Sequence, residues 1–234
     1  METMKRKNII TVWGDSLAKG VIWNAERRRH GYAEETAADV VSRQLNLEIV
    51  NRARFGSTAP QGLAMIERDL ENGWTCDTAV IEFGGNDCNF DWAAVSDAPE
   101  AEHDPMTKPE EFEQALRRII EKLRCAAIRP VLVTLPPIDA EKYFQFLVGD
   151  KLNPANVLKW LGDKQRIYRF QEMYSLIVEK VARETDCKLI DLRRHCLQNR
   201  SMYEMICEDG LHLNEKGQIF VGNEISRMIL QGEA

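Results

Sequence analysis

The chain has 234 residues, of which 44% are hydrophobic and 29% charged, a composition typical of one globular α/β domain with a substantial core. Its formal net charge of -6 argues against nucleic acid or an anionic membrane as partner, because phosphate groups would be repelled on average. No apolar run approaches the length of a membrane span, and the short basic start does not resemble a signal peptide. We therefore expect a cytoplasmic protein.

Six cysteines are scattered along the chain without a CxxC pair. Since nothing in the sequence signals export, we expect reduced thiols rather than disulfides. His195 and Cys196 could be combined with Cys187 and Cys207 as zinc ligands, but their spacing fits no usual ligand pattern. The sequence therefore predicts no metal site, and the absence of a P-loop or GxGxxG motif predicts no nucleotide cofactor.

Five short apolar runs alternate with helical patterns. The runs are continuous rather than alternating in polarity, which is typical of parallel strands covered on both faces. This order predicts right-handed crossovers and a three-layer α/β/α sandwich with a five-stranded, doubly wound parallel sheet. The predicted strands lie at 9–13, 47–51, 78–83, 131–135 and 188–192.

Three of the helical patterns are clear. The first begins with a capping box between Thr107 and Glu110, and the second covers 166–184. The last helix follows residue 214 and precedes the end of the chain. The residues expected to face inward from it are Ile219, Ile225 and Ile229.

Two connections, 88–107 and 136–165, are unusually long. Long loops at the carboxyl edge of a sheet more often build or cover a pocket than merely connect elements. The aromatic residues of the second connection could line a cap over a site, or they could pack a helical insertion into the core. We expect a single domain over 1–234 with a cap or insertion at about 136–165. Its aromatic residues are Tyr143, Phe144, Phe146 and Trp160.

Chemically interesting residues follow the predicted strands, where ligands bind in open parallel sheets. Ser16 follows the first strand, Gly56 the second and Asn86 the third, and Asp209 and His212 stand just before the last helix. Taken singly, each of these could be an ordinary turn residue. Together they provide the groups that nucleophilic catalysis needs.

A serine hydroxyl becomes a nucleophile only when a nearby base accepts its proton. We interpret His212 as the base for Ser16, and Asp209 as the carboxylate that orients the imidazole and stabilises its charged form. Attack on an ester carbonyl also creates an oxyanion, which needs hydrogen-bond donors aimed at it. Asp15 and Asp87 are interpreted as structural residues that hold their turns through bonds to the backbone.

The blocks Gly14-Asp15-Ser16-Leu17, Gly56, Gly84-Gly85-Asn86-Asp87 and Asp209-Gly210-Leu211-His212, in this order, resemble the SGNH/GDSL hydrolase family. The resemblance extends from residue 9 to the final helix. It implies a flavodoxin-like topology and hydrolysis of esters or thioesters through an acyl-enzyme, without a cofactor. It also implies an oxyanion hole formed by the backbone N–H groups of Ser16 and Gly56 and the side-chain amide of Asn86.

The substrate is less constrained than the reaction. Short-chain acyl or acetyl esters are the first interpretation, and lysophospholipids, thioesters and acetylated sugars stay open. The alternative from another class is a non-catalytic binding module on a flavodoxin-like fold, since a fold alone does not fix a function. The sequence does not indicate an oligomeric state. The basic run 27–30 could attract an anionic group, but a solvated face is the more ordinary interpretation of such a run.

Overall fold

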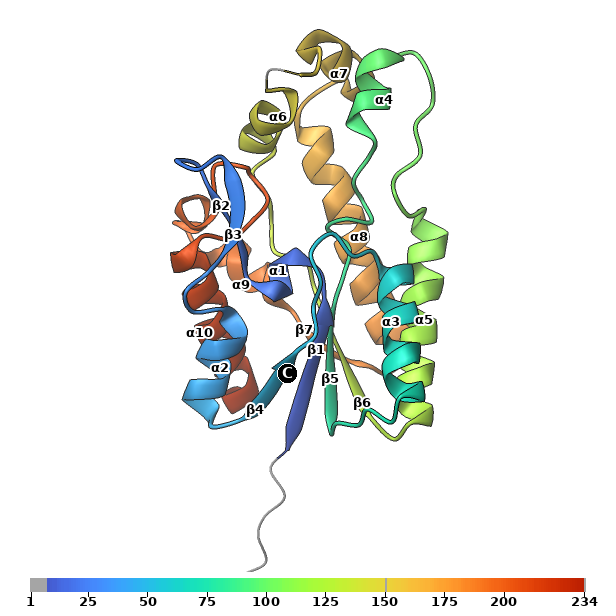
Figure 1. The fold of residues 1–234 in the computed structure, drawn as a ribbon, viewed down its shortest axis with the longest axis vertical. Helices are drawn as coiled ribbons and strands as arrows, with labels where there is room; N and C mark the ends of the chain where they lie inside the picture. Colours follow the sequence, from blue (N-terminus) through green and yellow to red (C-terminus); the bar gives the residue numbers. More distant parts are fainter. Residues whose placement is uncertain (1–7, 150, 234) are drawn as a thin grey trace, which may run out of the picture.

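The computed structural model describes residues 8–149 and 151–233. At its centre lies a five-stranded parallel sheet in the order β4-β1-β5-β6-β7, as Figure 1 shows. This is the strand order of a flavodoxin-like, doubly wound fold, so the predicted fold class and all five predicted strands are confirmed. The strands are β1 (Ile9–Gly14), β4 (Glu48–Asn51), β5 (Thr78–Glu82), β6 (Arg129–Val133) and β7 (Lys188–Ile190).

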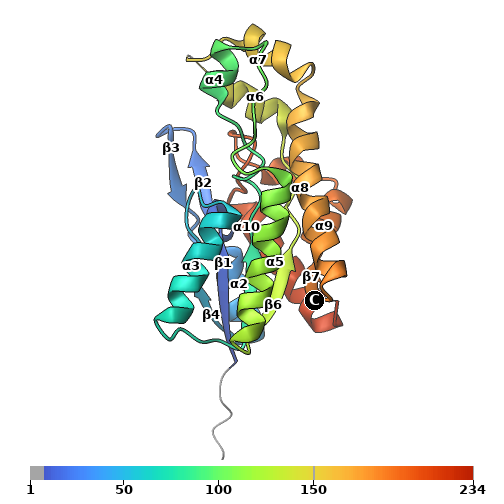
Figure 2. The same cartoon turned by 90° about the vertical axis from the view of Figure 1, so that its right-hand side faces the viewer.

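Helices cover both faces of the sheet, which explains why the strands are apolar without alternation (Figure 1; Figure 2). The larger core lies on one face, where Trp13, Ile81 and Leu132 are almost fully buried. The helices on that face are α3 (Ala59–Glu71), α5 (Pro109–Cys125) and α8 (Gln165–Glu184). Those on the opposite face are α2 (Ala37–Leu45), α9 (Leu192–Gln198) and α10 (Glu215–Gln231).

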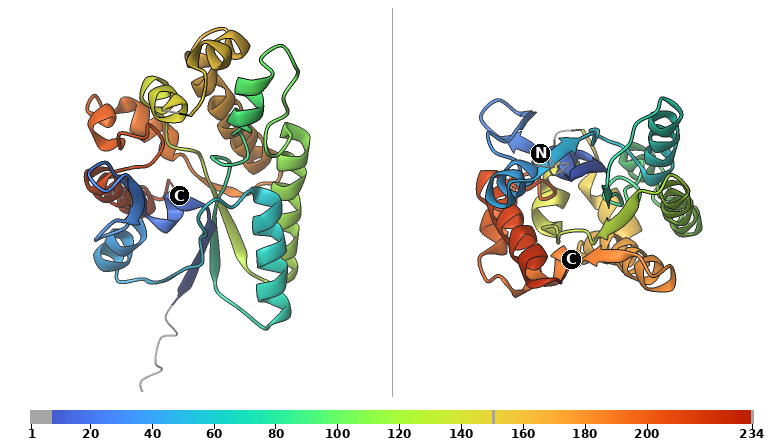
Figure 3. Two further views of the ribbon diagram at one scale, coloured as in Figure 1. Left: turned by 45° about the horizontal axis from the view of Figure 1, so that its top comes forward. Right: turned by 90° about the horizontal axis from the view of Figure 1, so that it is seen from below.

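A group of short helices stands above the carboxyl edge of the sheet (Figure 1; Figure 3, left). It is built from both long connections and has an apolar cluster of its own. Tyr143 and Phe144 are buried in that cluster, whereas Phe146 is 38% exposed. The aromatic segment therefore packs a small core and also presents one ring outward. The helices are α4 (Trp92–Asp97), α6 (Ala140–Val148) and α7 (Pro154–Leu161).

An antiparallel hairpin that the sequence analysis did not predict stands beside α6 (Figure 1). It consists of β2 (Val21–Asn24) and β3 (Arg29–Tyr32), and its register pairs Trp23 with His30. The arginines at its tip are exposed, as expected for a solvated face. His30 is also partly exposed, but its ring packs against the ring of His212.

The predicted capping box at the start of α5 is wrong. Lys108 is the N-cap of this helix, and no side chain caps it. Thr107 is buried and is held by another segment, because its backbone N–H donates to the carbonyl of Asp87. A long-range contact thus replaces the local one that the sequence pattern favoured.

The inward orientation predicted for Ile219 is also wrong, because its side chain is 40% exposed. The buried positions of α10 include Val221 and Met228, and Ile225 is partly buried between them. At 100° per residue, Ile219 lies about 120° around the helix from Ile225, which turns it away from the sheet.

Two further expectations concern the whole chain. All six cysteines are free, and five of them are buried. Within the described residues, no helix combines the length and apolar character that crossing a bilayer requires.

Candidate active site

The polar segments predicted from the sequence meet above the carboxyl ends of β1 and β5. Ser16 begins the short helix α1 (Ser16–Lys19) directly after β1. Its Oγ lies 2.9 Å from Nε2 of His212, and Nδ1 of the same imidazole lies 2.6 Å from Oδ2 of Asp209. All three side chains are buried. A hydroxyl, an imidazole and a carboxylate are therefore connected in one hydrogen-bonded line.

The loop that carries Asp209 and His212 is closed on itself before α10 begins. The backbone N–H of Cys207 donates to the carbonyl of His212 at 2.8 Å, and Ile206 and Leu213 form an antiparallel bridge. Gly210 is required at the tip. Its φ of +76° lies in the left-handed region, and a Cβ there would come within 2.2 Å of the backbone of Tyr143 in α6.

The Asp209 carboxylate is held in one orientation. Oδ1 accepts the backbone N–H groups of Leu211 and His212, both at 3.0 Å, while Oδ2 faces the imidazole. Burial alone would raise the pKa of Asp209. The hydrogen bond and charge of His212, with the two backbone N–H groups, outweigh burial and lower the pKa below its ordinary value. The carboxylate is thus ionised and fixed in place beside the imidazole.

Asp15 has the structural role predicted for it. It caps α1 by accepting the backbone N–H of Leu17 at 2.9 Å, and its other oxygen accepts Nδ2 of Asn86 at 3.1 Å. Burial raises the pKa of Asp15, and burial together with the charge of Asp15 raises the pKa of Glu82 well above its ordinary value. The two carboxyl groups lie directly behind the Ser16 turn and connect it to β5.

Asp87 also bonds to backbone, as predicted. Its two oxygens accept the N–H of Ala59, at 2.9 and 3.1 Å, at the start of α3. Burial raises the pKa of Asp87 to about 7. Asp87 therefore anchors the start of α3, the helix that follows Gly56.

Of the three residues predicted to form the oxyanion hole, only Ser16 and Asn86 line the cavity. Nδ2 of Asn86 donates to Asp15 and, at 3.1 Å, to the carbonyl of Ser57, so both of its hydrogens have protein acceptors. Asn86 lines the same cavity as Ser16, whereas Gly56 does not. The φ of +75° at Gly56 is the reason for glycine there, since a Cβ would meet nothing within 4 Å.

A cavity of about 330 Å³ opens beside Ser16 and His212 and extends under the upper helices. Most of its wall is apolar, with Phe90, Ile167 and Phe170 among the lining residues. Several polar groups in the wall are hydrogen-bonded to one another. Oδ1 of Asn89 accepts the indole N–H of Trp92, at 2.7 Å, and the hydroxyl of Tyr143. The cavity is suited to an apolar group.

The similarity to known proteins covers the segments that carry these residues. The model of the GDSL-like lipase/acylhydrolase family matches residues 12–218. The chain belongs to this family. The resemblance inferred from the four sequence blocks is thereby confirmed, and the protein is a hydrolase of the GDSL family.

This GDSL-family chain is similar to two curated proteins from a plant and a mammal. It is 25% identical over 201 residues to GDSL esterase/lipase WDL1 of Oryza sativa subsp. japonica, an alignment that covers 84% of this chain and 70% of that protein. It is 26% identical over 200 residues to the isoamyl acetate-hydrolyzing esterase 1 homolog of Bos taurus, covering 82% of this chain and 72% of the relative.

Solved structures agree with the GDSL assignment at the level of the fold. The lipase/acylhydrolase from Enterococcus faecalis is 19% identical and matches with a TM-score of 0.70 over 96% of both chains. The acetyl xylan esterase AlAXEase is 20% identical and matches with a TM-score of 0.63 over 94% of this chain and 99% of its own.

One residue of this GDSL-family site was missed by the sequence analysis. His30 lines the cavity, and its Nε2 lies 3.7 Å from Oδ2 of Asp209. Burial and the nearby His212 lower the pKa of His30, although Asp209 acts in the opposite direction. The available signal was a hairpin pattern, because the apolar run 21–23 and Tyr32 flank a mostly polar turn.

His195 was considered as a zinc ligand from the sequence and rejected on spacing. His195 contacts Glu224 and Arg227, and its Nδ1 lies 2.8 Å from Nη2 of that arginine. Over the part of the chain that the structure describes, only His30, Asp209 and His212 form a group of at least three side chains with metal-ligand geometry.

Proposed function

We propose that this protein is a serine hydrolase that cleaves carboxylic esters through an acyl-enzyme formed on Ser16. The observation that carries the proposal is the pair of contacts at His212, 2.9 Å from its Nε2 to the serine Oγ and 2.6 Å from its Nδ1 to Asp209. A nucleophile, a base and an orienting acid within hydrogen-bond reach are what acyl transfer requires.

In this mechanism, His212 takes the proton of Ser16 as Oγ attacks the ester carbonyl. Asp209 keeps the remaining imidazole proton on Nδ1 and stabilises the imidazolium. His212 then protonates the departing alcohol, and the same base activates a water molecule that hydrolyses the acyl-enzyme. The covalent bond to Ser16 is thus formed and broken once in each turnover.

The negative oxygen of the tetrahedral intermediate would be stabilised by the backbone N–H groups of Ser16 and Gly56 and by the amide of Asn86. Because both hydrogens of Asn86 Nδ2 already have acceptors, the oxyanion would share one of them with Asp15 or Ser57. That amide is held in position before the substrate arrives, which lowers the reorganisation that the reaction requires.

For the substrate, we propose an ester with a short to medium apolar acyl chain. The cavity of about 330 Å³ is larger than the roughly 150 Å³ cavity that suffices for a benzene molecule, so an acetyl group would fill only part of it. Its apolar wall favours a hydrocarbon chain over a sugar, whose hydroxyls would lose their hydrogen bonds to water. The single domain 1–234 would then use residues 136–165 as its cap.

The test compares the purified protein with Ser16→Ala on p-nitrophenyl acetate, butyrate, hexanoate and octanoate. We expect turnover that depends on Ser16 and a higher kcat/KM for the longer esters than for the acetate. Equal slow release of nitrophenol by both proteins would contradict the proposal. Acyl-CoA, lysophospholipid and acetylated xylose complete the panel, because the same site could serve them.

A matched pair of variants tests the proposed preference for longer acyl chains. Leu147 lines the cavity, whereas Leu158 on α7 is 37% exposed and does not line it. Leu147→Trp should reduce octanoate hydrolysis more than acetate hydrolysis, and Leu158→Trp should affect neither. A uniform loss with Leu147→Trp would show that the acyl chain binds elsewhere.

A further inference from the structure

The hairpin β2–β3 brings a second imidazole to the catalytic carboxylate. Nε2 of His30 lies 3.7 Å from Oδ2 of Asp209, a distance too long for a normal hydrogen bond. The His30 ring also stands edge-on to the His212 ring, with 5.0 Å between the centroids and 70° between the planes. The carboxylate oxygen that faces His212 is thus approached by two histidines.

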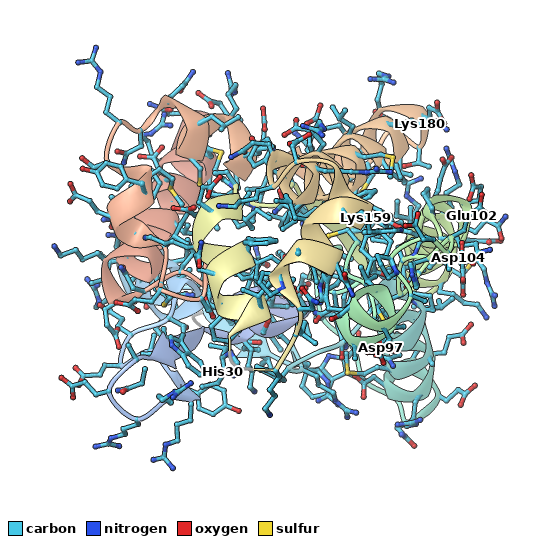
Figure 4. All side chains as sticks on the ribbon, turned by 90° about the horizontal axis from the view of Figure 1, so that it is seen from above. His30, Asp97, Glu102, Asp104, Lys159 and Lys180 are labelled. Atoms are coloured by element: carbon cyan, nitrogen blue, oxygen red, sulfur yellow. The ribbon has the colours of Figure 1, made fainter. Side chains whose placement is uncertain are left out.

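The position of His30 is fixed by its neighbours. Trp23 packs against it across the hairpin, with ring centroids 4.9 Å apart, and Phe55 approaches it at 5.1 Å. Its side chain is 33% exposed, so the group can be reached from solvent. In the view of Figure 4, His30 lies at the edge of the molecule next to the hairpin. Asp97, Glu102 and Asp104 lie to its right, over other elements.

We propose that His30, Asp209 and His212 bind a divalent transition-metal ion such as Zn²⁺, and that this ion switches the hydrolase off. One ligand atom from each residue can be chosen so that all three lie within 4.8 Å of one another. Two imidazole nitrogens and a carboxylate oxygen form a donor set that Zn²⁺ binds readily, with water as a further ligand. Mg²⁺ and Ca²⁺ prefer sites made of oxygen alone.

For the two pairs that include Asp209, the adjustment required is less than about 1 Å. Donor atoms in a tetrahedral site with bonds of about 2.0–2.1 Å lie roughly 3.4 Å apart. The 3.7 Å between His30 and Asp209 must shorten slightly, and the 2.6 Å between His212 Nδ1 and Asp209 Oδ2 must widen. The ion therefore replaces the hydrogen bond that orients the catalytic imidazole.

Metal binding would change which nitrogen of His212 carries the proton. Neutral imidazole carries one proton, which Asp209 keeps on Nδ1 in the proposed catalytic form. When the ion takes the Nδ1 lone pair, the proton resides on Nε2, which then points an N–H at Ser16 and can no longer accept its proton. No bond in a substrate is broken and nothing is oxidised or reduced. The base is lost by a change of tautomer.

The binding test uses Ser16→Ala, which keeps all three ligands and cannot form an acyl-enzyme. Titration with Co²⁺, followed by its visible absorption, should give one tetrahedral site without thiolate charge-transfer bands. His30→Phe retains an aromatic ring between Trp23 and Phe55 but removes the ligand, so it should weaken Co²⁺ and Zn²⁺ binding by roughly tenfold or more. His103→Phe, which removes a half-buried histidine bonded to the carbonyl of Ala98, is the matched control and should bind as before.

Equal affinity of the Ser16→Ala protein with and without His30 would overturn the proposal, as would thiolate bands or the absence of a tetrahedral site. If His30→Phe does not give the circular dichroism and melting curve of the parent, His30→Gln replaces it with the same expectation. Mg²⁺ should not compete with Co²⁺. Competition by Mg²⁺ would place the ion among the surface carboxylates instead.

The inhibition arm rests on the proposed esterase function. Zn²⁺ should inhibit ester hydrolysis reversibly, with full recovery after EDTA, and the concentration for half inhibition should rise at least about tenfold in His30→Phe. If the protein hydrolyses no ester, the Co²⁺ titration still decides the metal site. If hydrolysis is normal but equally sensitive to Zn²⁺ in both proteins, the metal proposal alone is wrong.

Discussion

Replacing Asp209 by asparagine tests how the catalytic imidazole is held. Oδ1 of Asp209 accepts two backbone N–H groups, so an amide at this position must place its oxygen there and its NH2 toward His212. The reverse orientation would leave two buried N–H groups without an acceptor, at about 1–3 kcal/mol each. With the NH2 facing Nδ1, the imidazole proton moves to Nε2 and the base for Ser16 is lost.

We expect Asp209→Asn to reduce kcat by about 10⁴-fold, the size of effect associated with the wrong tautomer in Ser-His-Asp sites. KM should change little, because no cavity wall is altered, and the melting temperature at pH 8 should stay near that of the parent. The assay is steady-state hydrolysis of p-nitrophenyl butyrate, with thermal melting as the folding control. A folded variant that retains more than a tenth of the parent kcat would refute this account of the carboxylate.

Three further predictions concern Asn86, Asp87 and Gly62. Asn86→Ala should lower kcat by about 10²–10³-fold in the same assay, with little change in KM, because an oxyanion donor is removed. A rise in KM with kcat unchanged would contradict that role. Burial raises the pKa of Asp87 in the folded state to about 7, against about 3.9 when unfolded. The free energy of unfolding should therefore fall by about 3 kcal/mol as the pH rises from 4 to 7. Asp87→Asn keeps an acceptor for Ala59 but cannot ionise, so urea melts should show it gaining stability relative to the parent from pH 5 to pH 8, whereas a constant difference would contradict the pKa. Gly62→Ala would place a Cβ within 2.2 Å of the buried Phe83 ring. Although alanine is the better helix residue, the variant should be less stable by about 1–3 kcal/mol in the same melts. A more stable variant would refute this contact.

The sheet could be predicted because its strands are buried on both faces and therefore read as unbroken apolar runs. The position of Ser16 and Asn86 followed from the same physics, since both come directly after such runs and the carboxyl ends of parallel strands share one edge. Asp209 and His212 are near neighbours in sequence, so their contact needed only a tight turn.

Features that depend on distant contacts could not be predicted in this way. Thr107 has a good capping sequence, but the backbone of Asp87 holds it elsewhere. The hairpin β2–β3 has strands of only four residues that are partly exposed, so their polarity pattern is weak. His30 consequently looked like one more member of a basic run, and its approach to Asp209 is visible only in three dimensions.

The role of the aromatic segment 143–161 could not be predicted from the sequence, for a different reason. Its sequence fits a lid and a core equally well, because both need large apolar side chains. In the structure, Tyr143 is buried and bonds to Asn89 and Trp92, whereas Phe146 is partly exposed and packs edge-on to Trp23. Both rings line the cavity. Composition alone does not separate these two uses.

Active-site labelling examines the central claim most directly. The intact protein would be treated with a fluorophosphonate at pH 8 and the modified peptide identified by mass spectrometry, beside His212→Ala. The account predicts one adduct, on Ser16, formed far more slowly when the imidazole is absent. Failure of the folded protein to react, modification at another residue, or equal labelling of both proteins would contradict it.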